Sequence, residues 1–205
     1  MKDKIADLTE LQISALREVV NIGVGNAVTS LSKMISKEVR IEVPGLKVEL
    51  IERVPEVSGG ADAVVAGVII QVAGDIEGYI MMMLSEESVK TVCATITGDH
   101  NADILDPLSQ SLIEEVGNIL AGSYVSSLSD FLNLGIKLSP PMQTFDMLGA
   151  IIDHILIEMS KKAEHALLFD TLFTIEGHEM DGILLTLFDP DSMDVLLERI
   201  DGMMG

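Results

Sequence analysis

An eight-residue pattern occurs twice in this chain and limits the folds that the chain can adopt. The segment Ser14–Asn21, SALREVVN, returns as Ser111–Asn118, SLIEEVGN, and each copy is followed at the same distance by a proline, Pro44 or Pro141. The serine, the glutamate, the asparagine and the proline are all displaced by 97 positions. A constant displacement through four residue types is hard to obtain by chance, so the pattern indicates a duplicated unit.

Each copy is expected to lie in a long helix. Thr9 and Gln12 have the spacing of a capping box, and apolar residues follow them with a helical period. Before the second copy, Asp106 can cap a helix whose first residue is a proline, which is tolerated there because no backbone N–H is needed. The sequence therefore predicts helices at about Thr9–Ile35 and Pro107–Leu132.

The repeated polar residues fall in one line along each helix. At about 100° per residue, each set lies within an arc of roughly 60°; the sets are Ser14, Glu18, Asn21 and Gly25, and Ser111, Glu115, Asn118 and Gly122. The simpler interpretation is a solvated face without function, since Ser, Glu and Asn are ordinary surface residues. A functional face is favoured because Asn is a poor helix residue, and because Gly weakens a helix by about 1 kcal/mol unless something must approach closely.

A carboxylate and an amide on adjacent turns suit the positioning of water. The amide of Asn is neither acid nor base, but it donates and accepts hydrogen bonds together and can hold a water molecule. Phosphoryl hydrolysis asks the protein mainly to position reactants, and an ionised Glu can bind a cation of a docked partner. Ser14 and Ser111 have no His or Lys in the pattern to activate them, so a covalent phosphoenzyme is not expected.

The motif of Asp or Ser, three residues, Glu, two residues, Asn, 22 residues and Pro resembles that of the CheC / CheX / FliY family of chemotaxis phosphatases. Both copies fit it, and two intact copies in 205 residues without an appended switch domain are most similar to the CheC branch. The resemblance covers nearly the whole chain. It implies a phosphatase of the phosphorylated response regulator CheY.

The resemblance also implies roles for the motif residues. Glu18 and Glu115 would hold the receiver, and Asn21 and Asn118 would align water on its aspartyl phosphate, with Ser14, Pro44, Ser111 and Pro141 as supporting motif positions. The receiver would carry its own Mg²⁺, so neither a cofactor nor a metal site is expected in this chain.

A second partner is implied by the same resemblance, the receptor deamidase CheD. The helix expected after Pro141 would be the docking element, with Asp146 as its exposed acid. The alternative function is therefore a non-catalytic interaction module that sequesters CheD, and the two functions are compatible. A simpler interpretation of Asp146 is an acid favoured at a helix N-terminus by the helix dipole.

The charge balance argues against several classes of partner. With 13 basic and 33 acidic residues the formal net charge is −20, a field that repels nucleic acid and anionic lipid. No run reaches the roughly 20 apolar residues of a membrane span, and residues 1–7 show no signal-peptide pattern. The single Cys93 excludes an intrachain disulfide and is expected to be a small core residue on a helix. These features predict a cytoplasmic protein without membrane insertion.

The remaining segments predict strands between helices. In the first half, alternation at Glu38–Val43 is broken by Pro44-Gly45 and resumes at Lys47–Val54, followed by a hairpin of Ala63–Ala73 with Ile76–Leu84 and a helix at Ser85–Ile96. In the second half we expect a helix at Phe145–Met159, a hairpin of Ala166–Ile175 with Met180–Leu187, and a last helix from Asp189-Pro190 to Asp201-Gly202. Strands bunched in hairpins favour an α+β fold.

The chain is therefore expected to be one domain, residues 1–205, built of two repeats at about 8–99 and 105–202. The resemblance implies a pseudo-twofold arrangement with a shared, largely antiparallel sheet and the two long helices side by side on one face. Aromatic residues make up only 3% and Trp is absent, so the core must be aliphatic, and Met81–Met83 is expected to pack in it.

Other motifs are weak. Gly23-Val-Gly25 lies in a helical pattern instead of following a strand, which argues against a nucleotide-binding loop. The four histidines, at positions 100, 154, 165 and 178, have no spacing typical of a metal site.

Overall fold

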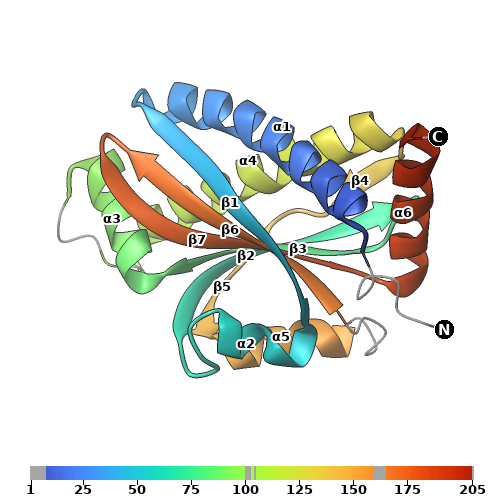
Figure 1. Ribbon diagram of the computed structural model, residues 1–205. Helices are drawn as coiled ribbons and strands as arrows, with labels where there is room; N and C mark the ends of the chain where they lie inside the picture. Colours follow the sequence, from blue (N-terminus) through green and yellow to red (C-terminus); the bar gives the residue numbers. More distant parts are fainter. Residues whose placement is uncertain (1–7, 100–102, 104, 159–164, 205) are drawn as a thin grey trace.

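An antiparallel sheet separates two layers of helices (Figure 1). The computed structural model describes residues 8–99, 103, 105–158 and 165–204. The first half consists of α1 (Glu10–Ile35), β1 (Val39–Leu50), the 3₁₀ turn η2 (Ile51–Arg53), α2 (Val54–Val57), β2 (Val64–Gly74), β3 (Gly78–Ser85) and α3 (Glu86–Thr97). The second half consists of α4 (Pro107–Leu132), β4 (Ile136–Leu138), β5 (Met142–Met147), α5 (Leu148–Glu158), β6 (His165–Ile175), β7 (His178–Phe188) and α6 (Pro190–Met204).

The sheet has the same plan from either edge. Its strand order is β1-β6-β7-β3-β2-β4, with β5 also paired to β2, and every pairing is antiparallel. In the two halves β1 corresponds to β4 and β5, β2 to β6, and β3 to β7. When each strand is replaced by its counterpart, the same order is obtained, read from the opposite edge of the sheet. The first strand of each half pairs with the hairpin of the other half, β1 with β6 and β4 and β5 with β2. The predicted α+β class with a shared antiparallel sheet is confirmed.

The ends of the two long helices repeat as well. The predicted capping box of α1 is present, because the Gln12 N–H donates to Thr9 Oγ1 at 3.2 Å and the Thr9 N–H donates to Gln12 Oε1 at 3.0 Å. Both helices end at a left-handed residue at equivalent positions, Ser36 with φ 55° and Asn133 with φ 52°. Asp106 occupies the N-cap position of α4, but its carboxylate caps no helix N–H. The prediction of that cap was wrong, since the residue type permits a side-chain cap but does not ensure one.

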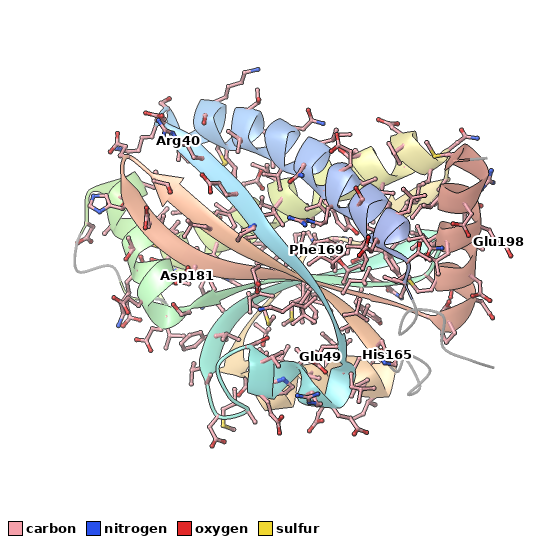
Figure 2. The ribbon with its side chains drawn as sticks, in the orientation of Figure 1. Arg40, Glu49, His165, Phe169, Asp181 and Glu198 are labelled. Atoms are coloured by element: carbon pink, nitrogen blue, oxygen red, sulfur yellow. The ribbon has the colours of Figure 1, made fainter. Side chains whose placement is uncertain are left out.

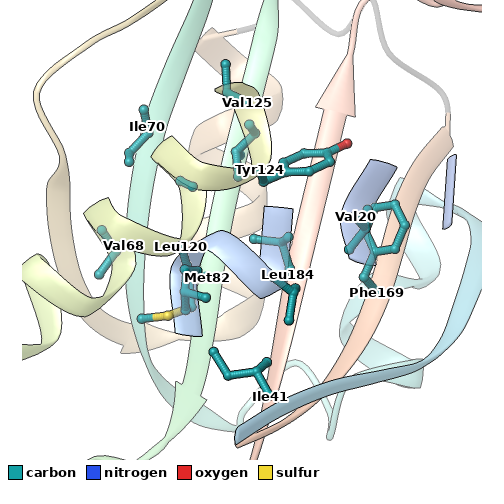
Figure 3. Close-up of a cluster of buried hydrophobic side chains, with 14 of the residues drawn as sticks. Val20, Ile41, Val68, Ile70, Met82, Leu120, Tyr124, Val125, Phe169 and Leu184 are labelled. Atoms are coloured by element: carbon teal, nitrogen blue, oxygen red, sulfur yellow. The ribbon is translucent and has the colours of Figure 1, made fainter. Parts of the chain in front are cut away.

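The long helices lie side by side on one face of the sheet, and α3 and α6 cover the two ends of the same face (Figure 1). Where α1 meets α4, Gly23 brings the backbones together: a Cβ at Gly23 would lie 2.8 Å from Tyr124 Cα. Tyr124 extends beneath this contact to Phe169 of β6, with ring centroids 6.0 Å apart and an interplanar angle of 58° (Figure 3). Burial raises the pKa of Tyr124 to about 12.

The opposite face of the sheet is covered by α2 and α5 (Figure 1). Its cluster contains Met81 and Met83, whereas Met82 points into the cluster beneath the long helices. All three methionines are buried, which confirms their predicted role in the core. Cys93 is also buried, on α3, and burial raises the pKa of its thiol, which lowers its reactivity.

Strand β1 continues through Pro44 and Gly45, where the sequence predicted a break. Its pairing with β6 shifts between Glu42 and Gly45, so a bulge absorbs the proline. A bulge in an edge strand tolerates proline, which has no N–H to donate to the sheet. The predicted strand at 47–54 is consequently wrong beyond Leu50, since the chain turns there into η2 and α2.

In the second half two prolines divide the equivalent strand. Pro140 and Pro141 separate β4 from β5. Neither strand was predicted, because β4 has only three residues and the last three residues of β5 were assigned to the helix that follows. The helix predicted at Phe145–Met159 begins three residues later, at Leu148, and its predicted last residue lies outside the described residues, as does His100. Asp146 therefore lies in β5 and not on the helix.

The last helix begins where it was predicted to begin. Asp189 Oδ1 accepts from the Ser192 N–H at 2.7 Å, ahead of Pro190 in the first turn. The helix continues past the predicted end at Gly202 to Met204.

Edge strand β1 carries charges along its length (Figure 2). Arg40 and Glu49 mark its two ends, and Lys47 forms an ion pair with Asp170 of β6 at 2.8 Å. Charged side chains on an edge discourage pairing with another chain.

Two glycines on α1 should respond oppositely to a methyl group. Gly23→Ala should lower the free energy of unfolding by about 1–3 kcal/mol, because the new Cβ would clash with the α4 backbone. Gly25→Ala should raise it by about 1 kcal/mol, because nothing lies within 4 Å of that Cβ and Ala is the better helix former. Urea denaturation of both variants tests this, and equal destabilisation would contradict the described helix contact.

Candidate functional site

The repeated motif forms a line of side chains on the outer face of each long helix. We call Ser14, Glu18, Asn21 and Gly25 of α1 the first ridge, and Ser111, Glu115, Asn118 and Gly122 of α4 the second ridge. All four residues of the first ridge are exposed. In the second ridge Ser111 and Glu115 are exposed, whereas Asn118 and Gly122 are half-buried. The predicted lines therefore face outward, because the apolar stripe of each helix packs on the sheet.

The functional groups of the ridges are not used by the fold. Within the described residues, no hydrogen bond or ion pair involves the side chains of Glu18, Asn21, Glu115 or Asn118. A surface carboxylate or amide without a partner contributes little to stability. These two carboxylates and two amides are thus free to bind a second molecule.

The glycines of the ridges have no role in internal packing. On the inner face of the helices, a Cβ on Gly117 would lie 2.5 Å from Val68 Cβ, so close packing requires that glycine. Gly25 and Gly122 differ, because nothing lies within 4 Å of a Cβ built on either. Glycine destabilises each helix at these positions, and no close internal packing requires it there. Such bare helix surface suits the close approach of a partner.

Pro44 is tied to the first ridge. Arg17, beside Glu18, donates from Nη2 to the Pro44 carbonyl oxygen at 3.3 Å, which joins the ridge-bearing turn to the bulge of β1. The position equivalent to Arg17 in α4 is Glu114, so Pro141 has no such bond. The first ridge thus carries a cation where the second carries another acid.

This contact was missed in the sequence. Arg17 and Pro44 belong to different elements, and only the path of the edge strand brings them together. The one available signal was that both lie beside motif residues of the same copy.

Asp146 is separate from both ridges. It is exposed at the end of β5, and its Oδ1 accepts from the Met147 N–H at 2.7 Å. The carboxylate therefore stabilises the turn from β5 into α5. It is not the exposed acid of a helix, as the sequence had suggested.

The described residues do not offer another evident centre for chemistry. Among them, no group of three or more His, Cys, Asp or Glu side chains is placed to hold a metal ion. Neither Ser14 nor Ser111 forms a hydrogen bond to a His or Lys in this part of the chain. Gly23 and Gly25 lie within α1, as predicted, and not in a loop after a strand.

Comparison with known proteins identifies the family. The model of the CheC-like family matches residues 11–48 and 108–142, which contain the two ridges and both motif prolines. The protein named CheY-P phosphatase CheC from Bacillus subtilis (strain 168) is 32% identical over 195 residues, covering 92% of this chain and 93% of that protein. The chain belongs to the CheC-like family. The resemblance predicted from the repeated motif is confirmed.

Solved structures support the family fold. Thermotoga maritima FliY matches with a TM-score of 0.74 at 20% identity, covering 95% of this chain and 98% of that chain. The chemotaxis protein CheX from Desulfovibrio desulfuricans matches with a TM-score of 0.54 at 15% identity, covering 84% and 99%. At these identities the likeness concerns the fold. Both matches agree with an α+β unit like those of the CheC-like family.

The helices of the described residues were also compared with the requirements of a membrane span. In residues 8–99, 103, 105–158 and 165–204, no helix combines the length and the apolar character needed to cross a bilayer.

Removing the ridge amides should not destabilise the fold. Asn21→Ala and Asn118→Ala should each change the free energy of unfolding by less than about 0.5 kcal/mol, or raise it slightly, because Ala is the better helix former and no internal hydrogen bond is lost. Thermal and urea unfolding of the single variants measure this. A loss of about 2 kcal/mol at either site would mean that the amide serves the fold.

Proposed function

We propose that this protein is a phosphatase of a phosphorylated CheY-type receiver, with one catalytic surface on each ridge. The observation that carries the proposal is the pair of unpartnered Glu–Asn sets in line on the outer faces of two equivalent helices, with Glu18, Asn21 and Glu115 exposed and Asn118 half-buried. The relative from Bacillus subtilis bears the name CheY-P phosphatase, which supports the same substrate here. The catalytic residues are Glu18 and Asn21 on α1 and Glu115 and Asn118 on α4.

The shape of the ridges suits a protein substrate. Enzymes of small molecules usually enclose them in a concave pocket, whereas these side chains stand on the outer face of helices. A receiver that presents its aspartyl phosphate in its own cleft can accept such a ridge. Gly25 and Gly122 leave the helix backbone bare at one end of each ridge, so the receiver can approach closely.

The asparagine acts by orienting water. Its carbonyl oxygen accepts from the attacking water while its NH₂ group donates to an acceptor at the phosphorylated site, which holds the water in line with the breaking P–O bond. The transition state of phosphoryl hydrolysis demands little covalent chemistry from the protein, so one aligned amide contributes usefully: each 1.4 kcal/mol or so gives a tenfold rate.

The glutamate fixes the docking register. Ionised Glu18 or Glu115 lies about one turn before its Asn, where it can pair with a cation of the receiver. The products are the free receiver carboxylate and inorganic phosphate, and water supplies the attacking oxygen. No phosphoenzyme forms, since Ser14 and Ser111 have no base to activate them. The receiver supplies the Mg²⁺ that neutralises its phosphate. We place this reaction in the cytoplasm.

Loss of both amides should abolish the activity. Asn21→Ala with Asn118→Ala should return the decay of the phosphorylated receiver to its spontaneous rate, because neither ridge can orient water. Phosphate release or receiver decay measured at substoichiometric protein tests this. Asn26→Ala is a matched control, because Asn26 is exposed on α1 but lies outside the ridge.

Two results would sink this assignment. One is undiminished acceleration by the double variant. The other is transfer of labelled phosphate onto this chain during turnover, which would require a nucleophile that the mechanism lacks.

A second function is favoured by the surroundings of Asp146. Exposed Met142 and Met147 lie on the same short edge strand as Asp146, so the strand presents an acid and apolar side chains to solvent. We propose that this strand and the start of α5 bind a CheD-type deamidase. The docking function is compatible with catalysis, since it uses neither ridge.

Reversing the charge of Asp146 tests this second function. Asp146→Lys should weaken CheD binding at least tenfold in a calorimetric titration and leave basal dephosphorylation unchanged. Asp153→Lys, which reverses another exposed acid, on α5, is the control for charge alone. Unchanged affinity of the Asp146 variant would remove the residue from the interface.

A further inference from the structure

Two exposed leucines occupy equivalent places beside the ridges. Leu11 of α1 and Leu108 of α4 are separated by the same 97 positions as the motif residues. Their side chains are exposed to nearly equal extents, 58% and 61%. Single exposed apolar residues are common on protein surfaces, but the same residue at the same repeat position with the same exposure is a property of the repeated unit.

The leucines extend the line of each ridge. Leu11 precedes Ser14 by three residues, so at about 100° per residue it lies roughly 60° from it, on the exposed side of the helix. Asn21 follows Leu11 by ten residues, which corresponds to about 15 Å along the helix axis at 1.5 Å per residue. The stretch from leucine to asparagine fits within one side of a standard protein interface, about 800 Å². Leu108 and Asn118 have the same relation on α4.

Another apolar side chain borders the first ridge. Ile22, next to Asn21, is 43% exposed and lies on the same flank of the helix as Leu11. At the second ridge the equivalent Ile119 is half-buried and packs against the core. Of these two pairs of apolar residues, only the leucines are exposed beside both ridges. On each helix the leucine precedes the ridge Glu by seven residues, or about 10 Å at 1.5 Å per residue, within reach of a partner that contacts the ridge.

We propose that Leu11 and Leu108 are apolar anchors for the same phosphorylated receiver that the ridges bind. This inference rests on the proposed function and adds the specificity-determining contact that it lacks. With a net charge of −20, the protein gains little long-range attraction for an acidic partner. Burial of apolar surface at the end of each ridge supplies affinity that does not depend on charge. The occupant is a receiver with an apolar patch beside its phosphorylated cleft.

The anchors are tested by steady-state kinetics of the full chain. Leu11→Ala with Leu108→Ala should raise the KM for the phosphorylated receiver about tenfold and leave kcat within about twofold, because a buried methyl-rich contact is lost and the water-orienting amides remain. Ile157→Ala is the matched control: Ile157 is 66% exposed, but it lies on α5 across the sheet. Its KM should equal that of the wild type.

The outcomes separate this inference from the proposed function. If the Asn21→Ala and Asn118→Ala double variant is inactive while the leucine variant keeps the wild-type KM, the anchors are wrong and the phosphatase stands. If the double asparagine variant is fully active, the phosphatase assignment fails first. If light scattering shows that the leucine variant disrupts a dimer without changing KM, the leucines bind a second copy of this chain instead, and the proposal is overturned.

Discussion

The close contact between α1 and α4 determines which side chains this protein shows to its surroundings. Gly23 admits the backbone at Tyr124, and the apolar stripes of both helices are thereby held against the sheet. A helix fixed on one face has no freedom to rotate, so the opposite face is fixed as well. The outward direction of Glu18 and Asn21 is a consequence of packing on the other side of the same helix. The fixed direction of the ridge side chains therefore comes from the core.

The core orients the long helices, so the polar side chains of the ridges need no support from other polar residues. Within the described residues the Glu and Asn side chains of the ridges form no hydrogen bonds, and the packing of each 26-residue helix on the sheet sets their direction. Gln12 Nε2 donates to Asp201 Oδ1 at 3.0 Å and joins the start of α1 to α6. At the first ridge Arg17 adds a bond to the Pro44 carbonyl, whereas the second ridge has Glu114 in that place. The duplicated surfaces thus carry the same motif residues but differ in local charge and in the exposure of the Asn and Gly.

Local patterns in the sequence predicted the elements that form locally. The long helices, both hairpins and the line of motif residues follow from period and capping, which need no knowledge of distant partners. Errors gathered at the prolines, because pairing in the sheet decides whether Pro44 ends a strand or sits in a bulge, and whether Phe145 joins a strand or a helix. The Arg17–Pro44 contact had the same non-local origin. The roles of the ridges came from family resemblance, since an exposed Glu and Asn alone do not specify a substrate.

The exchange of edge strands between halves governs how the chain can reach its native state. The hairpin of β2 and β3 obtains its outer neighbours only when residues 136–147 have been synthesised, and β1 has no partner until β6 exists. During translation the amino-terminal half therefore exposes unsatisfied strand edges, which are prone to aggregation. Each repeat obtains the outer neighbour of its hairpin from the other repeat. A single repeat could complete its sheet only by associating with a second copy of itself.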